Sequence, residues 1–253
     1  MGRDYYDEYY DQTFVKGRKY SNDETRRIKA TINMIPKDVS SLLEVGCGEG
    51  RIINPLQNKY EKIFGMDISD EALKHVETSK IKGRIENIPF PDNSFDIVLY
   101  CEVLEHLPSP IYEKALKEIK RVAKKYVLIS VPNDEDIQMG KVRCPNCRSL
   151  CHVNGHLRSF NLSNMKNLFD IGKLLKYEIV PIDVFWFHET VIQVKKWLKK
   201  DFFTFEDAGF CPKCGFTHSS DQNKVKSPYF LEKLPFQFPT KKSGGWIIAL
   251  YRK

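Results

Sequence analysis

The sequence predicts an α/β fold with a doubly wound, mostly parallel seven-stranded sheet and helices on both faces. Three observations predict it. Apolar strand-like segments alternate with helix-like segments over residues 42–133. The first of these strands ends in a glycine-rich turn, and a last apolar strand returns after a long irregular stretch. Right-handed crossovers would then place the turn at the carboxyl edge of the sheet, where such folds bind ligands.

Hydrophobic periodicity and breaker residues place the individual elements. The first helix is expected over 25–34, where isoleucines recur at helical spacing and Pro36 stops the pattern. Ser69 can cap a helix that begins at residue 70. Further helices are expected at 51–60, 70–79, 111–122, 162–169 and 190–199. Strands are expected at 42–45, 62–67, 81–85, 95–100, 126–131, 177–185 and 244–251.

Composition limits the kind of protein. The 253 residues are 42% hydrophobic, which suits a globular domain whose core needs no disulfides. The N-terminus is charged and lacks a secretory signal, and no apolar run is long enough to span a bilayer. We therefore expect a cytoplasmic protein that does not insert into membranes. The formal net charge of +7 is typical of a solvated lysine-rich surface, and attraction to RNA, phosphates or anionic lipid stays open.

The most specific motif is the turn E-V-G-C-G-E-G at residues 44–50. A strand, a tight turn and a helix N-terminus form the usual cradle of a nucleotide-like cofactor. A dinucleotide fingerprint would require its third glycine where Arg51 stands. The glycines instead run G-x-G-x-G, with Glu44 two residues before the first. This pattern resembles the first motif of class I S-adenosylmethionine-dependent methyltransferases, which have a Rossmann-like core.

Further motifs of that family follow in the family's order. Asp67 ends the second strand, where a carboxylate can accept hydrogen bonds from ribose hydroxyls. Residues 83–96, G-R-I-E-N-I-P-F-P-D-N-S-F-D, resemble the family's segment beside the adenine. Residues 101–107, C-E-V-L-E-H-L, resemble its V-L-E-H-L motif beside the methionine part of the cofactor. The resemblance implies S-adenosyl-L-methionine as cofactor and transfer of its methyl group.

The resemblance also implies site residues. Expected cofactor contacts are Glu44, Gly46, Cys47, Gly48, Asp67, Ile68, Ile85, Glu86 and Cys101. His106 is the histidine expected nearest the reaction centre, as a general base or as a capping and packing residue. Arg84 departs from the family pattern, because arginine has no acceptor for the adenine amino group. We expect the Ile85 backbone, with Glu86 or Asn87 nearby, to read the adenine instead.

The seven cysteines of a chain expected to be cytosolic favour metal binding over disulfides. Two C-x-x-C pairs look like zinc knuckles and together supply four thiolates, the closed set of a structural Zn²⁺ site. These are Cys144, Cys147, Cys211 and Cys214. A local site of Cys144, Cys147, Cys151 and either His152 or His156 is the alternative, and free or redox-active pairs are another.

Six segments follow from these expectations. They are an N-terminal helical cap (1–41), a cofactor-binding Rossmann-like core (42–135), a first zinc-knuckle insertion (136–157), a continuation of the core (158–185), a second insertion with a knuckle (186–242) and the last core strand (243–253). Together they predict a core with a small zinc-binding accessory lobe.

The predicted function is methyl transfer to a small-molecule oxygen or carbon acceptor. Residues 100–103 read Y-C-E-V, so the N-P-P-Y-type segment of amino-group methylases is missing there. An RNA or protein methyltransferase is the alternative, since the net charge and the zinc lobe suit a larger partner. A non-catalytic protein that retains the cofactor fold and uses the zinc lobe for partner contacts is another. The sequence does not predict an oligomeric state.

Overall fold

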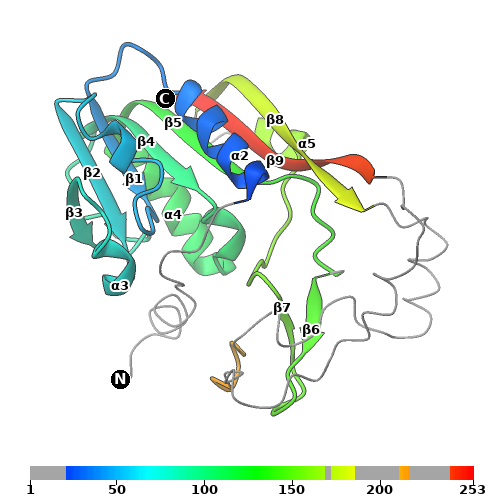
Figure 1. Ribbon diagram of the computed structural model, residues 1–253. Helices are drawn as coiled ribbons and strands as arrows, with labels where there is room; N and C mark the ends of the chain where they lie inside the picture. Colours follow the sequence, from blue (N-terminus) through cyan, green and yellow to red (C-terminus); the bar gives the residue numbers. More distant parts are fainter. Residues whose placement is uncertain (1–20, 139, 169–171, 186–210, 217–239) are drawn as a thin grey trace. The chain divides into compact units, whose positions relative to one another are not determined.

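The computed structural model describes residues 21–138, 140–168, 172–185, 211–216 and 240–253 (Figure 1). The chain divides into two compact units, with residues 1–135, 158–181 and 244–253 in the first and residues 136–157 and 182–243 in the second. The first 20 residues of the N-terminal helical cap and the helix expected at 190–199 lie outside the described residues. None of the helices in the described part of the chain has the length and apolarity needed to cross a bilayer.

The first unit is built on a seven-stranded sheet with the order β3-β2-β1-β4-β5-β9-β8 (Figure 1). Its strands are β1 (Ser41–Val45), β2 (Lys62–Asp67), β3 (Ser79–Lys82), β4 (Phe95–Cys101), β5 (Ala123–Pro132), β8 (Lys173–Phe185) and β9 (Thr240–Arg252). The β1–β2, β1–β4, β2–β3 and β4–β5 pairs are parallel, and β9 runs antiparallel to β5 with Ala249 opposite Ile129. The predicted mostly parallel seven-stranded sheet is confirmed.

Each face of the sheet buries a separate apolar core. Neighbouring residues of a strand point to opposite faces, so Leu42 and Leu43 of β1, both fully buried, belong to different cores. The core of Leu43 includes the apolar face of α4 (Ser109–Val122). The core of Leu42 includes Ala30 of α2 (Asn22–Asn33). Helices therefore cover both faces, and each fully buried leucine contributes about 1.5–3 kcal/mol.

The segment after the glycine-rich turn is not the full helix that the sequence predicts at 51–60. It forms turns around a short 3-10 helix, η1 (Asn54–Leu56). Pro55 has no N–H to donate, and the Asn54 side chain is bound outside the segment, where its Oδ1 accepts a 2.9 Å hydrogen bond from the Glu77 amide. A side chain that binds distant backbone competes with regular helix formation. The prediction of a helix over residues 51–60 was therefore wrong.

Two other helices begin where predicted and end earlier. Ser69 accepts a 3.1 Å hydrogen bond from the Ala72 amide, as a helix cap, but α3 (Asp70–Leu73) has only one turn. The helix predicted at 162–169 is α5 (Leu162–Lys166). The starts were predictable because capping side chains are local signals.

In the second unit, the described residues include a two-stranded antiparallel sheet. Its strands are β6 (Lys141–Arg143) and β7 (Leu150–His152), with Val142 opposite Cys151. The connection between them carries the first C-x-x-C pair. A small buried cluster joins Val142 and Val153 to the thiols of this unit.

Candidate active site

The glycine-rich turn follows β1 with three left-handed residues. Gly46, Gly48 and Gly50 have φ angles of 71°, 52° and 81°, a conformation that glycine adopts without penalty. A Cβ on Gly46 would lie 2.3 Å from Cγ2 of Val103, so this position also requires glycine for space. The Gly46 amide donates a 2.7 Å hydrogen bond to the carbonyl of Met66. The turn is thereby fixed to the end of β2.

A cavity of about 330 Å³ opens where β1, β2 and β4 end. This is a volume within the range of small-molecule and cofactor sites. All nine predicted cofactor contacts line it: Glu44, Gly46, Cys47, Gly48, Asp67, Ile68, Ile85, Glu86 and Cys101. His106 is not among the described residues that line the cavity. The structure thus brings the predicted cofactor residues together, and His106 is outside this set of lining residues.

Asp67 holds the glycine-rich turn with its carboxylate. Oδ2 accepts a 2.7 Å hydrogen bond from the Gly48 amide, and Oδ1 accepts one of 2.9 Å from the Ser69 amide. Each carboxylate oxygen can accept more than one hydrogen bond. The Asp67 carboxylate thus connects the glycine-rich turn to the residues after β2 at the cavity lining.

Two buried ionisable side chains, Glu44 and Arg27, lie in the cavity wall. Glu44 is 3% exposed, and its Oε2 has no hydrogen-bond partner within the described structure. Burial raises the pKa of Glu44 to about 8, against the lowering effect of Arg27. Arg27, from α2, is 8% exposed, and its Nε and one terminal nitrogen have no hydrogen-bond partner among the described residues. Since buried polar groups are normally hydrogen-bonded, this pair fits the ammonium and carboxylate of an amino-acid ligand.

At the adenine end predicted by the sequence, Arg84 is paired with its neighbour. Its Nε donates a 2.7 Å hydrogen bond to Oε1 of Glu86, and both residues line the cavity. The Glu86 carboxylate neutralises the guanidinium of Arg84. Ile85, the residue between them, also lines the cavity.

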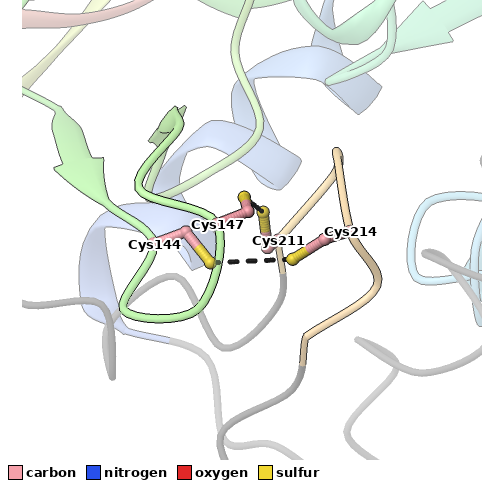
Figure 2. A group of neighbouring side chains, drawn as sticks. All are labelled: Cys144, Cys147, Cys211 and Cys214. Carbon is pink, nitrogen blue, oxygen red and sulfur yellow. Dashed lines mark hydrogen bonds between the residues drawn. The ribbon is translucent and has the colours of Figure 1, made fainter.

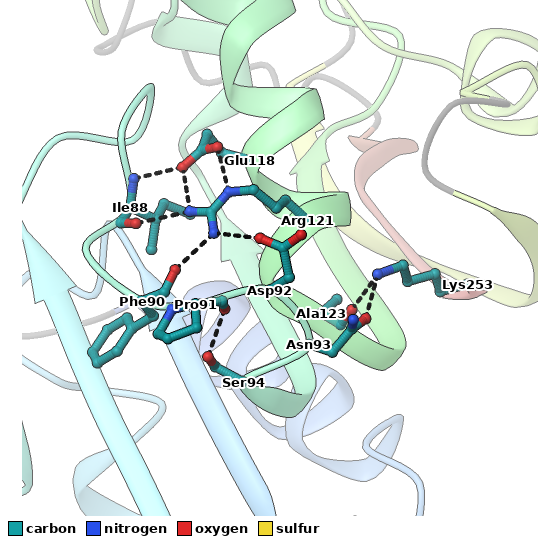
Figure 3. A network of polar contacts seen from close by, with 10 residues as sticks. All are labelled: Ile88, Phe90, Pro91, Asp92, Asn93, Ser94, Glu118, Arg121, Ala123 and Lys253. Atoms are coloured by element: carbon teal, nitrogen blue, oxygen red, sulfur yellow. Dashed lines mark hydrogen bonds and ion pairs between the residues drawn. The ribbon is translucent and has the colours of Figure 1, made fainter.

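The loop after this segment is anchored from behind by α4 (Figure 3). Arg121 donates hydrogen bonds to the carbonyls of Ile88 and Phe90, at 2.9 and 2.7 Å, and to Oδ1 of Asp92 at 3.0 Å. Glu118 accepts from Arg121 and from the Ile88 amide, each at 2.7 Å. The hydrogen bond from Arg121 lowers the pKa of Glu118. The P-F-P-D part of the motif therefore acts by fixing the loop that follows the cavity residues.

The other end of the cavity is formed where β4 ends. Burial raises the pKa of the Cys101 thiol well above its ordinary value, so Cys101 stays protonated and serves as a packing group rather than a nucleophile. The next residue, Glu102, lines the cavity with a φ of 58°, in the left-handed region. Its amide donates a 2.8 Å hydrogen bond to the carbonyl of Ser130. Sequence reasoning did not name Glu102 as a site residue, although it lies in the C-E-V-L-E-H-L motif. It also missed Arg27, which has no local pattern that marks it.

In the second unit the four cysteines of the two pairs converge (Figure 2). The Sγ atoms of Cys144 and Cys214 are 3.8 Å apart, those of Cys147 and Cys211 are 3.6 Å apart, and all four lie within 4.8 Å of one another. Four thiolates at about 2.3 Å from a tetrahedral zinc would be separated by about 3.8 Å. The spacing of the thiols therefore fits a Zn²⁺ ion.

Both C-x-x-C pairs have the same backbone turn. Arg148 and Gly215 each follow a second cysteine, with φ angles of 63° and 71°, and each donates its amide to the carbonyl of the first cysteine of its pair at 3.0 Å. Arg148 thus adopts the conformation for which glycine is favoured. The Ser149 hydroxyl beside Cys147 lowers the pKa of that thiol to about 6, which favours the thiolate that a metal needs.

The alternative local metal site is not assembled in the described residues. The Cys151 thiol donates to the carbonyl of Val142 at 3.8 Å and is outside the group of four sulfurs. The Nδ1 atom of His152 accepts hydrogen bonds from the amides of Asn154 and His156, at 3.2 and 3.3 Å. These contacts favour the set built from both pairs over the local set.

Residues 43–130 match the family described as Methyltransferase domain. An uncharacterised protein of Methanocaldococcus jannaschii is 39% identical over 102 residues, which are 38% of this chain and 43% of the relative. The crystal structure of YcgJ from Bacillus subtilis covers 92% of this chain and 100% of its own, with a TM-score of 0.52 and 17% identity. A S-adenosylmethionine-dependent methyltransferase of Thermotoga maritima covers 89% and 87%, with a TM-score of 0.51 and 18% identity.

Residues 43–130 are therefore similar to a methyltransferase domain, over the part of the chain that carries the cavity. The matched residues run from β1 to β5 and so contain the glycine-rich turn, Asp67 and the loop before β4. The structural likeness, at under 20% identity, shows the fold alone. The chain spans less than two thirds of the length of the first curated relatives it matches. None of these matches identifies the methyl acceptor.

Proposed function

We propose that this chain transfers the methyl group of S-adenosyl-L-methionine to a small-molecule oxygen or carbon acceptor, leaving S-adenosylhomocysteine. The observation that carries the proposal is the Glu44 carboxylate, buried without a hydrogen-bond partner for Oε2 in the wall of a cavity that also contains the glycine-rich turn. An ammonium group supplies what this carboxylate lacks. The cofactor, when bound, supplies a methyl group activated by its sulfonium.

The lining residues suit each part of that cofactor. Glu44 would accept from the ammonium group, and Arg27 would donate to the carboxylate of the methionine part. Asp67 would accept from the ribose hydroxyls, and the glycine-rich turn lets backbone approach closely, since a Cβ is absent there. The backbone of Ile85 would read the adenine.

The acceptor end of the cavity has an apolar wall. Val103, Leu107, Pro108 and Ile111 line it beyond Cys101. Such a wall binds the apolar body of a small molecule and leaves few polar groups to orient it. We therefore propose that the residues here act mainly by holding the acceptor in line with the methyl group, a contribution that does not require a base. His106 is not among the described residues that line the cavity, which agrees with a wall that acts without a base.

The second unit would contribute stability through a metal. We propose one structural Zn²⁺ held by Cys144, Cys147, Cys211 and Cys214. Closed thiolate sets leave no open position for chemistry. An RNA or protein acceptor is supported only by the net charge of +7 and by the expected zinc lobe.

Calorimetry with S-adenosylhomocysteine tests the cofactor assignment. The wild-type chain should bind it and should not bind NAD. Asp67→Ala should weaken binding by about 1–3 kcal/mol, the scale for hydrogen bonds to a charged group. Asp70→Ala is the matched control, because Asp70 is exposed three residues later and pairs with Lys82 at the surface. Equal affinity of the two variants would contradict the ribose role, and binding of NAD instead would overturn the proposal.

A further inference from the structure

The two halves of the glycine-rich turn are held by different parts of the chain. The amides of Gly46 and Gly48 fix the first half to the end of β2. The second half, which ends at Gly50, is fixed from the segment that follows, because the Asn54 amide donates a 2.7 Å hydrogen bond to the Gly50 carbonyl. This hydrogen bond brings the Asn54 side chain beside the Cα atom of Gly50.

The side-chain amide of Asn54 joins the turn to the connection between α3 and β3. Its Nδ2 donates hydrogen bonds to the carbonyls of Glu49, at 3.3 Å, and of His75, at 2.9 Å. Its Oδ1 accepts a 2.9 Å hydrogen bond from the amide of Glu77. A primary amide has two donors and two acceptor positions. Asn54 therefore uses both donors and one acceptor position to bridge two separate stretches of backbone.

The third glycine of the turn makes room for this bridge. A Cβ on Gly50 would lie 2.4 Å from Oδ1 of Asn54. Any side chain at this position would therefore push the Asn54 amide away from its three hydrogen bonds. The φ angle of 81° at Gly50 is a separate reason for glycine here.

The two stretches that Asn54 joins lead to different parts of the cavity lining. Glu49 lines the cavity directly after Gly48. The connection that contains His75 and Glu77 runs into β3, and the lining residues 83–86, at the expected adenine end, follow that strand. Asn54 itself is not among the described residues that line the cavity. It can therefore affect a ligand only through the segments it holds.

We propose that Asn54 is a positioning residue for the cofactor. It holds the glycine-rich turn and the connection into β3 at a fixed separation before the cofactor binds. A site that is ordered in advance loses less conformational freedom on binding. The inference rests on the proposed function, because the ligand that the two segments would hold is S-adenosyl-L-methionine.

Calorimetry with S-adenosylhomocysteine on the full chain tests the role of Asn54. Asn54→Ala should weaken binding by about tenfold or more, since the ligand must then order the turn that the amide no longer holds. Asn54→Asp keeps the shape of the side chain but loses both donors, so it should weaken binding as well. Asn58→Ala, which changes an exposed asparagine of the same segment, is the matched control and should keep the wild-type affinity.

A double-mutant cycle with Gly50→Ala tests the contact itself. In the wild type, Gly50→Ala both strains the backbone and displaces the Asn54 amide, whereas in Asn54→Ala only the strain remains. The loss of S-adenosylhomocysteine affinity caused by Gly50→Ala should therefore be about threefold or more smaller in the Asn54→Ala background, a coupling typical of residues in contact. An equal loss in both backgrounds would contradict the bridge.

Hydrogen exchange separates positioning from a general loss of stability. In ligand-free Asn54→Ala, the amides of residues 47–50 and 75–78 should exchange faster than in the wild type, while those of β4 and β5 keep their rates. Saturating S-adenosylhomocysteine should restore slow exchange in both stretches. Faster exchange throughout the chain would overturn the proposal, because Asn54 would then be only a structural residue.

The outcomes also separate this inference from the proposed function. If the wild type does not bind S-adenosylhomocysteine, the proposed function fails. If the wild type binds it and Asn54→Ala binds as tightly as Asn58→Ala, the positioning role alone fails. Should Asn54→Ala not fold, Asn54→Asp provides the same comparison with Asn58→Ala.

Discussion

Nε1 of Trp246 donates a 2.7 Å hydrogen bond to Oε2 of Glu102. Trp246 belongs to β9 and Glu102 directly follows β4, so the contact reaches across β5, the strand between them. The Trp246 ring also lies 5.5 Å from the guanidinium of Arg27. Through these contacts the antiparallel strand holds a strained residue at the acceptor end of the cavity.

Trp246→Phe should destabilise the fold, because it keeps a ring beside Arg27 but removes the donor to Glu102. We expect a loss of about 1–3 kcal/mol in urea unfolding, the range for a hydrogen bond to a charged group. Tyr126→Phe is the control, since the Tyr126 hydroxyl donates to Asp38 at an exposed site. A Trp246→Phe protein as stable as this control would contradict the role of the hydrogen bond.

Glu44→Gln should stabilise the ligand-free protein in a pH-dependent way. The unfolded chain ionises Glu44 above its ordinary pKa of 4.5, while the folded chain keeps the proton up to a pKa of about 8. Wild-type stability therefore falls as pH rises between these values, and the glutamine variant is spared that loss. The two proteins should be equally stable below pH 4.5, diverge up to pH 8, and keep a constant difference above it.

Urea unfolding at several pH values measures this difference, with Glu61→Gln, an exposed site on the same unit, as control. The same Glu44→Gln change should weaken binding of S-adenosylhomocysteine, because the ammonium group loses a charged acceptor. A difference that does not depend on pH, or unchanged cofactor affinity, would contradict the assignment of Glu44.

Arg84→Ala should leave the affinity for S-adenosylhomocysteine within about tenfold, or 1.4 kcal/mol. The guanidinium is engaged by Glu86 at 2.7 Å and has no acceptor for the adenine amino group. Calorimetry measures the effect, and Lys82→Ala, which removes an exposed cation nearby, reports the general effect of charge. A loss much beyond that of Lys82→Ala would mean that Arg84 stacks on the base or otherwise holds it.

Protein purified without chelators should contain about one zinc per chain, because four thiolates close one tetrahedron. Cys211→Ser should lower this occupancy, whereas Cys151→Ser should keep it, since the Cys151 thiol lies outside the group of four sulfurs. Elemental analysis measures both. Full occupancy in Cys211→Ser together with loss in Cys151→Ser would support the local site with a histidine instead.

The sequence could predict the cavity because the motifs that form it are local, and because the strand order of a parallel sheet is regular. The glycine-rich turn, Asp67 and the segment before β4 each follow a strand, and parallel strands bring their carboxyl ends to one edge. Their individual roles toward the cofactor stay predictions. The C-x-x-C pairs were visible for the same reason, although they are 64 residues or more apart.

What the sequence could not predict depends on packing between distant segments. Arg27 is one of two arginines in an amphipathic helix, and only tertiary structure shows that it lies in the cavity wall. The partnership of Trp246 with Glu102 spans 144 residues. The helix expected after the turn failed because the Asn54 side chain is bound by the backbone of Glu77, a contact with no local signal.

The order of strands in the sheet constrains how the chain can be completed during synthesis. β9 leaves the ribosome after the other six strands of this sheet, yet it lies between β5 and β8. Until it emerges, β5 presents an open edge, and β8 lacks the neighbour that joins it to the rest of the sheet. An open strand edge is a template for pairing with other chains. A nascent chain stalled before β9 would therefore be a natural client for chaperones, although its glycine-rich turn had already been made.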